Sequence, residues 1–340
     1  MTPENKNMTV LIITRSDDNE CVDSVAAAIK QKSGRPFRFD TDKFPTEVRL
    51  IAEYQPGAEK LLLISEAGEL DLREVTAIWH RRLEIGGRIP VTLDPQLRMA
   101  SIEESARTAK GMLASLKAFR MDPEPIIRRA ENKQLQIQVA RELGFETPRT
   151  LITNDADAVC AFARACESGI VTKMLSSFAV YQDGLEKVVF TNPVEDEDLK
   201  HLDGLKLCPM TFQEQVPKAL ELRVTVIGDQ LFAAAIDSQT SGAAQFDWRK
   251  DGVALLEHWK AYELTADIKK RLLRLMDYFQ LNYGAIDFIL TPDGRHVFLE
   301  INPAGEFFWL ERWPGLPISA AIADVLLGRA YRREVRNPPR

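Results

Sequence analysis

The sequence lacks the motifs of several common kinds of site. No two of its 4 cysteines form a C-x-x-C pair, so the pattern favours neither a zinc site nor a disulfide framework. We expect all of them, Cys21, Cys160, Cys166 and Cys208, to be buried free thiols. The phosphate-binding patterns G-x-x-x-x-G-K-S/T and G-x-G-x-x-G are also absent.

The chain has no excess of positive charge and no long apolar run. Its formal net charge of -6 argues against a nucleic acid as the main partner, because phosphate binding needs a basic surface. No apolar run reaches the roughly 18 residues of a membrane-spanning helix. The start, "MTPENKNMTVLIITRSDDNE", has neither the positive beginning nor the apolar stretch of a signal peptide. We therefore expect a cytoplasmic protein without a membrane or nucleic-acid partner.

What the sequence does contain is an alternation of strand-like and helix-like segments. Four short apolar runs are typical of strands, namely "TVLIITRS", "RPFRFDTDKF", "KLLLIS" and "TAIWHRR". Helical patterns cover 19–32 and 102–119, which together with these strands predicts a small α/β domain over residues 1–120. The prolines of "MDPEP" mark a joint after it.

The same alternation continues to the end of the chain. A helix opens at Lys133 and ends at Gly144, and further helices are expected near 265–281 and 317–328. In the helix near 265–281, the apolar residues Leu272, Leu275, Met276 and Phe279 form one stripe, which predicts core packing.

A predicted hairpin near the C-terminus carries a group of oxygen ligands. Side chains two apart in a strand share a face, so "HVFLEIN" points Glu300 and Asn302 the same way. The turn signal "TPDG" would fold the preceding strand back and bring Asp287 near them. Three oxygens without histidine or thiol suit Mg²⁺. A hydrogen-bonded polar patch at a strand end is the alternative.

Four more charged residues stand in apolar or helix-start positions. Glu221 and Arg223 share one face of the strand "ELRVTVIGD", where they could also be a simple ion pair. Lys173 lies in the apolar run "GIVTKMLSS", where a buried ammonium needs an anionic partner. Lys133 opens a helix, where a cation opposes the helix dipole unless a phosphate is near.

The order of these segments resembles the ATP-grasp fold. Along nearly the whole chain run N-K at a helix start, V-x-K on a strand, Q-E-x-V, E-L-R, a strand aspartate and E-x-N. More narrowly, "WHRR", "RRAENKQLQ", "FQEQVPKALELRVTVIG" and "LNYGAIDFILTPDGRHVFLEINPAGEFFWLE" resemble the ligases that make graspetides of the microviridin type. The resemblance implies an α/β ATP-grasp fold behind a small pre-ATP-grasp domain. Its subdomains would be 121–190 and 191–330, the latter holding the metal site.

The resemblance also implies roles for individual residues. ATP phosphates would be held by Lys133 and Lys173, and adenine by Glu214, Gln215 and Val216. Glu221 would bind the ribose hydroxyls, and Arg223 would stabilise the transferred phosphoryl group. Asp287, Glu300 and Asn302 would hold one or two Mg²⁺ ions. One departure concerns the phosphate flap, which is glycine-rich in many relatives but here offers Ser176, Ser177 and only Gly184.

The implied substrate is a ribosomal precursor peptide with a leader and a core rich in Thr, Ser, Asp and Glu. Its Asp or Glu side chains would be activated as acyl phosphates and joined to Ser or Thr as ω-esters. The acidic residues Glu195, Asp196, Glu197 and Asp198 could receive a basic leader, although such a run also suits a solvated loop. "WHRR" and "DWR" (247–249) could steer the acidic core, or Trp79 and Trp248 could simply be buried.

Several alternatives stay open at this point. A lysine amine would give an ω-amide, and an ATP-grasp ligase for free amino acids or a protein C-terminus would use the same ATP residues. A nucleotide-binding regulatory protein is the non-enzyme alternative. Phe307, Phe308 and Trp309 could wall the site against water or belong to the core. The resemblance further implies a homodimer.

Overall fold

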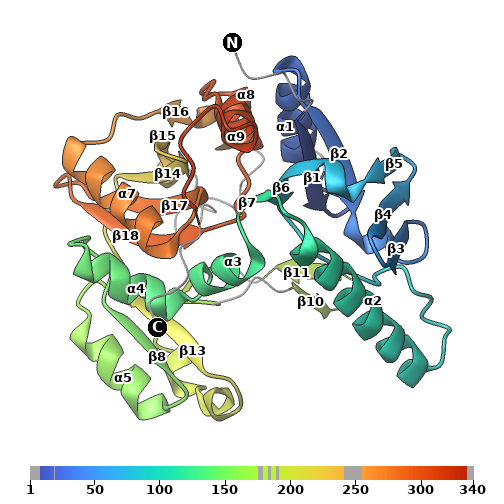
Figure 1. The fold of residues 1–340 in the computed structure, drawn as a ribbon. Coiled ribbons are helices and arrows are strands. Elements are labelled where there is room, and N and C mark those ends of the chain that lie inside the picture. The colour runs from blue at the N-terminus through green and yellow to red at the C-terminus, as the bar shows by residue number, and fades with distance from the viewer. Residues whose placement is uncertain are drawn as a thin grey trace.

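The computed structural model describes residues 8–18, 20–174, 179–182, 185–188, 191–240 and 255–334. Figure 1 shows three groups of elements, with the N-terminal one in blue to teal, a smaller one in green and yellow, and a C-terminal one mainly in orange and red. Ser176, Ser177, Gly184 and the segment 247–249, for which the sequence suggested roles, lie outside the described residues.

The N-terminal group is built on a 4-stranded parallel sheet of order β2-β1-β6-β7. Its strands are β1 (Thr9–Thr14), β2 (Arg35–Asp40), β6 (Val75–His80) and β7 (Phe119–Met121). A 3-stranded antiparallel sheet joins β3 (Arg49–Gln55), β4 (Ala58–Ser65) and β5 (Gly68–Asp71). All of β1 is buried, which is typical of a parallel strand covered on both faces.

The two faces of β1 belong to different cores. Val10 and Ile12 pack in a core with α1 (Glu20–Gln31) and α9 (Ile318–Leu326), although α9 comes from the other end of the chain. Leu11 and Ile13 pack with the antiparallel sheet and with α2 (Pro95–Ser115). The period of two in a strand separates these sets. The first core joins the N-terminal and C-terminal groups (Figure 1).

The smaller group is a 4-stranded sheet of order β12-β9-β13-β8 covered by one helix. Its strands are β8 (Thr150–Thr153), β9 (Ile170–Lys173), β12 (Asn192–Pro193) and β13 (Met210–Glu214), and its helix is α5 (Ala156–Ala165). A separate hairpin joins β10 (Ala179–Gln182) and β11 (Leu185–Val188). The sheet takes strands from both sides of residue 190, and the division of the chain at residues 120 and 190 stays a prediction.

The C-terminal group is a 5-stranded sheet of order β16-β15-β14-β17-β18. Its strands are β14 (Leu220–Ile227), β15 (Gln230–Ile236), β16 (Lys260–Ala261), β17 (Tyr283–Leu290) and β18 (His296–Asn302). One face packs on α4 (Lys133–Glu142) and α7 (Ala266–Phe279), and the other packs on α8 (Phe308–Arg312) and α9. A short helix, α3 (Glu124–Ala130), precedes α4. The predicted stripe of α7 is confirmed, because Leu272, Leu275, Met276 and Phe279 are all buried.

Two expectations from the sequence need correction. Cys21 and Cys166 are buried free thiols, but Cys160 is half-buried and Cys208 is exposed at the end of a short 3₁₀ turn. The helix expected over 102–119 spans Pro95–Ser115 instead, and Phe119 already belongs to β7. It begins at Pro95 because the Asp94 carboxylate caps it by accepting from the amides of Gln96 and Leu97. Within the described residues, no helix is both long and apolar enough for a membrane span.

A buried carboxylate connects the N-terminal group to the sheet of the C-terminal group. Asp122, just after β7, accepts hydrogen bonds from the backbone amides of Asn282 (2.8 Å) and Tyr283 (3.0 Å) and from the Asn282 side chain (2.9 Å). Asn282 in turn accepts from the amide of Arg333 (2.7 Å). The end of β7, the start of β17 and the C-terminal segment therefore meet at one carboxylate.

Replacing this carboxylate should cost much more stability than replacing an exposed one. In Asp122→Ala, three buried N–H groups lose their acceptor, so we expect the free energy of unfolding to fall by roughly 2–4 kcal/mol. The control is Glu103→Ala, which breaks the exposed pair with Arg107 on α2 and should change it by less than about 0.5 kcal/mol. Urea unfolding of the three proteins measures both values, and equal midpoints would contradict the role given to Asp122.

Candidate active site

The predicted hairpin forms, and it places the predicted oxygen ligands together. Strands β17 and β18 pair antiparallel with Asp287 opposite Glu300, and Asn302 follows two residues later on the same strand. On the other side of β17, Asp287 lies opposite Arg223 of β14. One row across three neighbouring strands therefore carries an arginine and two acids.

Each carboxylate of this row is paired with a cation. Nη1 of Arg223 donates to both oxygens of Asp287 at 2.8 Å, and the arginine side chain is 10% exposed. Nζ of Lys133 lies 2.8 Å from Oε2 of Glu300 and 3.4 Å from Oδ1 of Asn302. The Asn302 amide also donates to Glu300 (3.2 Å).

The charges around Glu300 fix its ionisation. Burial raises the pKa of Glu300, but the cations Lys133 and Lys173 and the Asn302 amide more than offset this and bring the pKa down to about 2. Burial lowers the pKa of Arg223, and the Asp287 carboxylate more than offsets this and raises it above the usual value. Both groups are therefore charged at neutral pH.

The two lysines reach this place from different elements. Asn132 caps α4 by accepting from the amide of Leu135 (2.9 Å), which makes Lys133 the first residue of the helix. Lys173 is the last residue of β9 and lies opposite Thr211 in the small sheet. Because it lowers the pKa of Glu300, Lys173 lies within electrostatic reach of that carboxylate.

The donor set fits a hard divalent cation. Two carboxylates and an amide oxygen, with no thiol or imidazole among them, are the ligands that Mg²⁺ prefers. Among the described residues no group of three or more His, Cys, Asp and Glu is placed to hold a metal, so the amide of Asn302 is needed to make a third protein ligand. The pairing with Arg223 and Lys133 shows that this place requires positive charge.

A residue that the sequence reasoning missed holds the edge of this site. Strand β18 is at the edge of its sheet, and the buried amide of Gln136 pairs with Ile301 as another strand would. It donates to the Ile301 carbonyl (2.9 Å) and accepts from the Ile301 amide (3.0 Å). Gln136 lies one turn after Lys133 on α4, so it fixes Glu300 and Asn302 relative to that lysine.

The segment predicted to frame adenine joins the small sheet to the C-terminal sheet. Glu214 ends β13, and the amide of Gln215 donates to the carbonyl of Gly169 (3.0 Å). Glu214, Gln215 and Val216 are all half-buried. Further along, Glu221 accepts from Ser238 (2.7 Å) and pairs with Lys218 (2.8 Å), a cation that the sequence reasoning also missed.

The aromatic residues after β18 belong to the core. Phe307 and Trp309 are buried among residues of α8 and α9, and Phe308 packs partly against them. The guanidinium of Arg223 lies 5.7 Å from the centre of the Trp309 ring, so this core residue also contacts the arginine. Trp79 is buried as well, and Arg81 beside it is 1% exposed, so neither is open to a peptide.

The acidic run lies on the surface near the small sheet. Glu195, Asp196, Glu197 and Asp198 are all exposed. Glu197 pairs with Lys200 (2.7 Å), and the Asp198 carboxylate accepts from the amide of Glu195 (2.9 Å).

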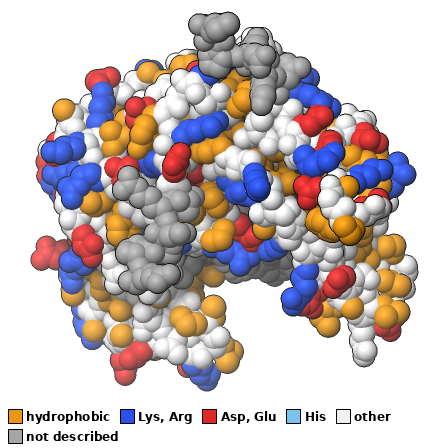
Figure 2. All heavy atoms as spheres, viewed as in Figure 1, with side chains coloured by type: hydrophobic (Ala, Val, Ile, Leu, Met, Phe, Trp, Pro, Cys, Tyr) orange, Lys and Arg blue, Asp and Glu red, His pale blue; other side chains and the backbone are white. Residues whose placement is uncertain are grey.

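Figure 2 shows the molecule hollowed between the lobe that carries α5 and the lobe that carries α2.

Comparison with known proteins finds matches over nearly the whole chain. Residues 9–128 match the family model described as the MvdD pre-ATP grasp domain. The macrocyclase MdnC of Microcystis aeruginosa MRC, solved with the precursor peptide MdnA, is 49% identical with a TM-score of 0.85, covering 94% of this chain and 100% of that one. A RiPP-associated ATP-grasp ligase of Chryseobacterium gregarium, solved with ADP and a leader and core peptide, is 38% identical with a TM-score of 0.92 (97% and 99% covered).

A third structure, the macrocyclase MdnB of Microcystis aeruginosa MRC, is 37% identical with a TM-score of 0.79, covering 94% of this chain and 99% of that one. A search among curated proteins finds no match.

The lowered pKa of Glu300 predicts how its charge contributes to stability. The folded pKa of about 2 lies below the ordinary value of 4.5, so the ionised form is favoured by folding. Its contribution is full above about pH 5 and is lost as the pH falls toward 2. The difference in unfolding free energy between wild type and Glu300→Gln should therefore shrink over that range. Urea unfolding at several pH values measures it, and a difference that grows with acid would contradict the assignment.

Proposed function

The chain belongs to the family of RiPP-associated ATP-grasp ligases that includes the macrocyclase MdnC, and on that premise we propose that it closes rings in a ribosomal precursor peptide. The observation that carries the proposal is the cluster of Asp287, Glu300 and Asn302 with Arg223 and Lys133, in a chain 49% identical to a macrocyclase. The reaction joins Asp or Glu side chains to Ser or Thr hydroxyls as ω-esters at the cost of ATP.

ATP binds between the small sheet and the C-terminal sheet in this proposal. Lys133 and Lys173 hold the phosphates, because their charges already converge on Glu300. Glu214, Gln215 and Val216, on the segment that joins the two sheets, hold adenine, and Glu221 holds the ribose hydroxyls. The ADP complex of the 38% identical ligase supports a nucleotide as the cofactor.

Asp287, Glu300 and Asn302 are the residues that would hold one or two Mg²⁺ ions. When bound, Mg²⁺ supplies positive charge that neutralises phosphate oxygens. The residues of the chain contribute charge of their own, because Arg223 is buried, ionised and fixed by Asp287 at 2.8 Å. Such a preorganised cation stabilises the negative charge that develops on a transferred phosphoryl group.

The chemistry proceeds in two displacements. A carboxylate oxygen of the peptide attacks the γ-phosphorus of ATP, the bond to the β-phosphate oxygen breaks, and ADP leaves. The hydroxyl oxygen of a Ser or Thr then attacks the acyl carbon, its proton is lost, and phosphate leaves. The peptide loses one water for each ring, and solvent must be excluded because water would hydrolyse the acyl phosphate.

The alternatives differ in the groups that are joined, or in whether any are joined. A lysine amine would give an ω-amide by the same two displacements, and a free amino acid or a protein C-terminus would need the same ATP residues. The ester is proposed on the resemblance to ligases of the microviridin type. A nucleotide-binding regulatory protein would consume no ATP with any peptide, and the charged cluster around Arg223 gives no reason to expect this.

The proposed partner is a precursor peptide with a leader and a core, since MdnC was solved with a precursor peptide and the Chryseobacterium gregarium ligase with a leader and core peptide. We propose that Glu195, Asp196 and Asp198 receive a basic leader, because they are exposed and lie beside the small sheet. The homodimer and the cytoplasmic location are also proposals, and sedimentation of the purified protein tests the first.

Removing the charge of one carboxylate ligand should slow ring closure strongly. We expect Asp287→Asn and Glu300→Ala to lower the rate of dehydration of a precursor peptide at least about 100-fold, because the charge stabilisation of the transferred phosphoryl group depends on this cluster. The assay is mass spectrometry of the peptide MdnA with ATP and Mg²⁺.

The matched control for this experiment lies on the same hairpin. Asp293 is in the turn between β17 and β18, is 63% exposed and pairs with Arg295, away from the cluster. Asp293→Asn should keep the rate within about twofold. Full activity of Glu300→Ala would contradict the proposed function.

Reversing the acidic run should weaken capture of the leader. We expect Glu195→Lys with Asp196→Lys to raise the Kd of labelled MdnA at least about tenfold at low salt, since two attractive charges become repulsive. Asp198 is kept in this variant because it caps the turn at Glu195. The control is Glu103→Lys with Glu104→Lys on α2, and fluorescence anisotropy measures both. An unchanged Kd in the first variant would remove this surface from the proposal.

A further inference from the structure

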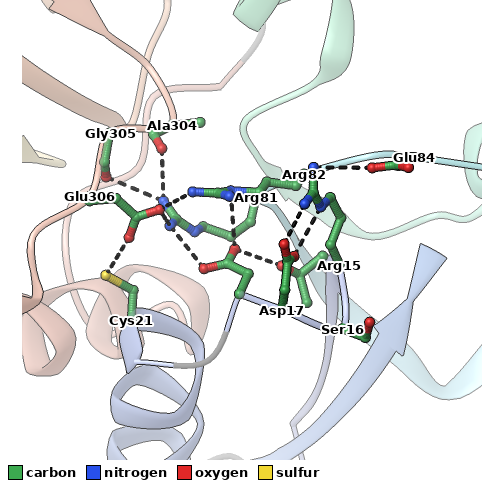
Figure 3. A network of polar contacts seen from close by, with 12 residues as sticks. Arg15, Ser16, Asp17, Cys21, Arg81, Arg82, Glu84, Ala304, Gly305 and Glu306 are labelled. Atoms are coloured by element: carbon green, nitrogen blue, oxygen red, sulfur yellow. Dashed lines mark hydrogen bonds and ion pairs between the residues drawn. The ribbon is translucent and has the colours of Figure 1, made fainter. Parts of the chain in front are cut away.

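Arg81, which follows β6 of the N-terminal sheet, is buried among groups of the C-terminal part. Its side chain is 1% exposed. Nη1 donates to the carbonyls of Ala304 (2.9 Å) and Gly305 (3.2 Å). Nη2 donates to Glu306 (2.9 Å) and lies 3.4 Å from Asp18. Figure 3 shows this guanidinium between the loop 304–306 and the residues that follow β1.

The loop that Arg81 holds is the one that also holds Arg223. Nη2 of Arg223 donates to the carbonyl of Glu306 (3.2 Å), and the Tyr283 hydroxyl donates to the carbonyl of Gly305 (2.7 Å). The loop lies so close to the arginine that a Cβ added to Gly305 would be 2.7 Å from Arg223 Nη2. A shift of the loop would therefore change the position of the Arg223 guanidinium relative to Asp287.

Arg81 is not needed to hold the N-terminal group of elements against the C-terminal group. The packing of α1 against α9 and the hydrogen bonds of Asp122 already join them. A buried guanidinium is a costly way to add cohesion, because its loss of hydration must be offset by well-placed partners. What it offers is a rigid planar set of donors, here aimed at two successive carbonyls and a carboxylate.

We propose that Arg81 is a positioning residue for the phosphoryl transfer: it fixes the loop 304–306 and, through the Glu306 carbonyl, the guanidinium of Arg223. The inference rests on the proposed function and adds to it a residue of the N-terminal domain. The N-terminal domain, which lies outside the sheets proposed to bind ATP, would then contribute to the reaction through Arg81. A displacement of about 1 Å at a reacting centre can cost about 100-fold in rate.

Arg82 provides a matched control. It is the next residue, and it also pairs with Glu306 and lies 3.6 Å from Asp18, but its side chain is 39% exposed. In the described part of the chain its side chain donates to neither carbonyl of the loop. Arg81→Lys and Arg82→Lys therefore make the same change beside the same acids, and only the first removes donors to the loop carbonyls.

The test is a double-mutant cycle between Arg81→Lys and Arg223→Lys. The variants are compared by kcat and KM for ATP in MdnA dehydration and by the Kd of Mg·AMPPNP. We expect Arg81→Lys to lower kcat roughly 10–100-fold with KM for ATP within about threefold of wild type. Arg82→Lys should stay within about twofold. With Arg223→Lys already present, Arg81→Lys should cost less than about twofold more, because it acts through Arg223.

Losses that multiply in the double variant would show a merely structural role, and Arg81→Lys with wild-type kcat would overturn the inference directly. Should Arg81→Lys fold poorly, Glu306→Gln replaces it, since this keeps the backbone carbonyl that Arg223 binds and removes the negative charge that pairs with Arg81. A graded loss of about three- to tenfold is then expected. A wild-type protein that binds Mg·AMPPNP but dehydrates no peptide would contradict the proposed function alone. The same cycle, read as the rate at which ADP is formed from ATP, then decides for or against Arg81 by the same coupling to Arg223.

Discussion

Two like charges face each other across neighbouring strands, and the rest of the site follows from the need to compensate them. Asp287 and Glu300 are opposite in the pairing of β17 with β18. Carboxylates held this close are stable only beside cations or in a protonated form. The chain meets the requirement with cations: Arg223 comes from the adjacent strand and Lys133 from the start of α4. This constraint fixes what the neighbouring elements must carry.

Each neighbouring element supplies one group from a fixed backbone position. β14 lies beside β17, so the register alone sets Arg223 opposite Asp287. Helix α4 begins at an asparagine cap, which places Lys133 at its first turn and Gln136 one turn later against the edge of β18. The loop after β18 is held from the N-terminal sheet by Arg81. Groups from distant parts of the chain therefore hold the backbone of the site.

Local geometry explains what the sequence could predict. The period of two in a strand and the turn signal between two strands were enough to bring Asp287, Glu300 and Asn302 together, because all three lie in one hairpin. The strands and the stripe of α7 follow from the same kind of pattern. Arg81 and Gln136 could not be found in this way. Arg81 meets a carbonyl 223 residues away, and no period in the sequence encodes such a contact.

The state of the carboxylates bears on how the site would receive its ligands. Positive neighbours hold the pKa of Glu300 near 2, and Arg223 keeps its charge beside Asp287. Glu300 is thus ionised at neutral pH before anything binds, so a divalent cation would compete there with the ammonium of Lys133 rather than with a proton. The side chains of Lys133 and Arg223 are suited to phosphate oxygens. When nucleotide and metal bind, the carboxylates would pair with the metal, and Lys133 and Arg223 would pair with phosphate oxygens. The ion pairs within the protein would thus be replaced with little change in the net charge of the buried row.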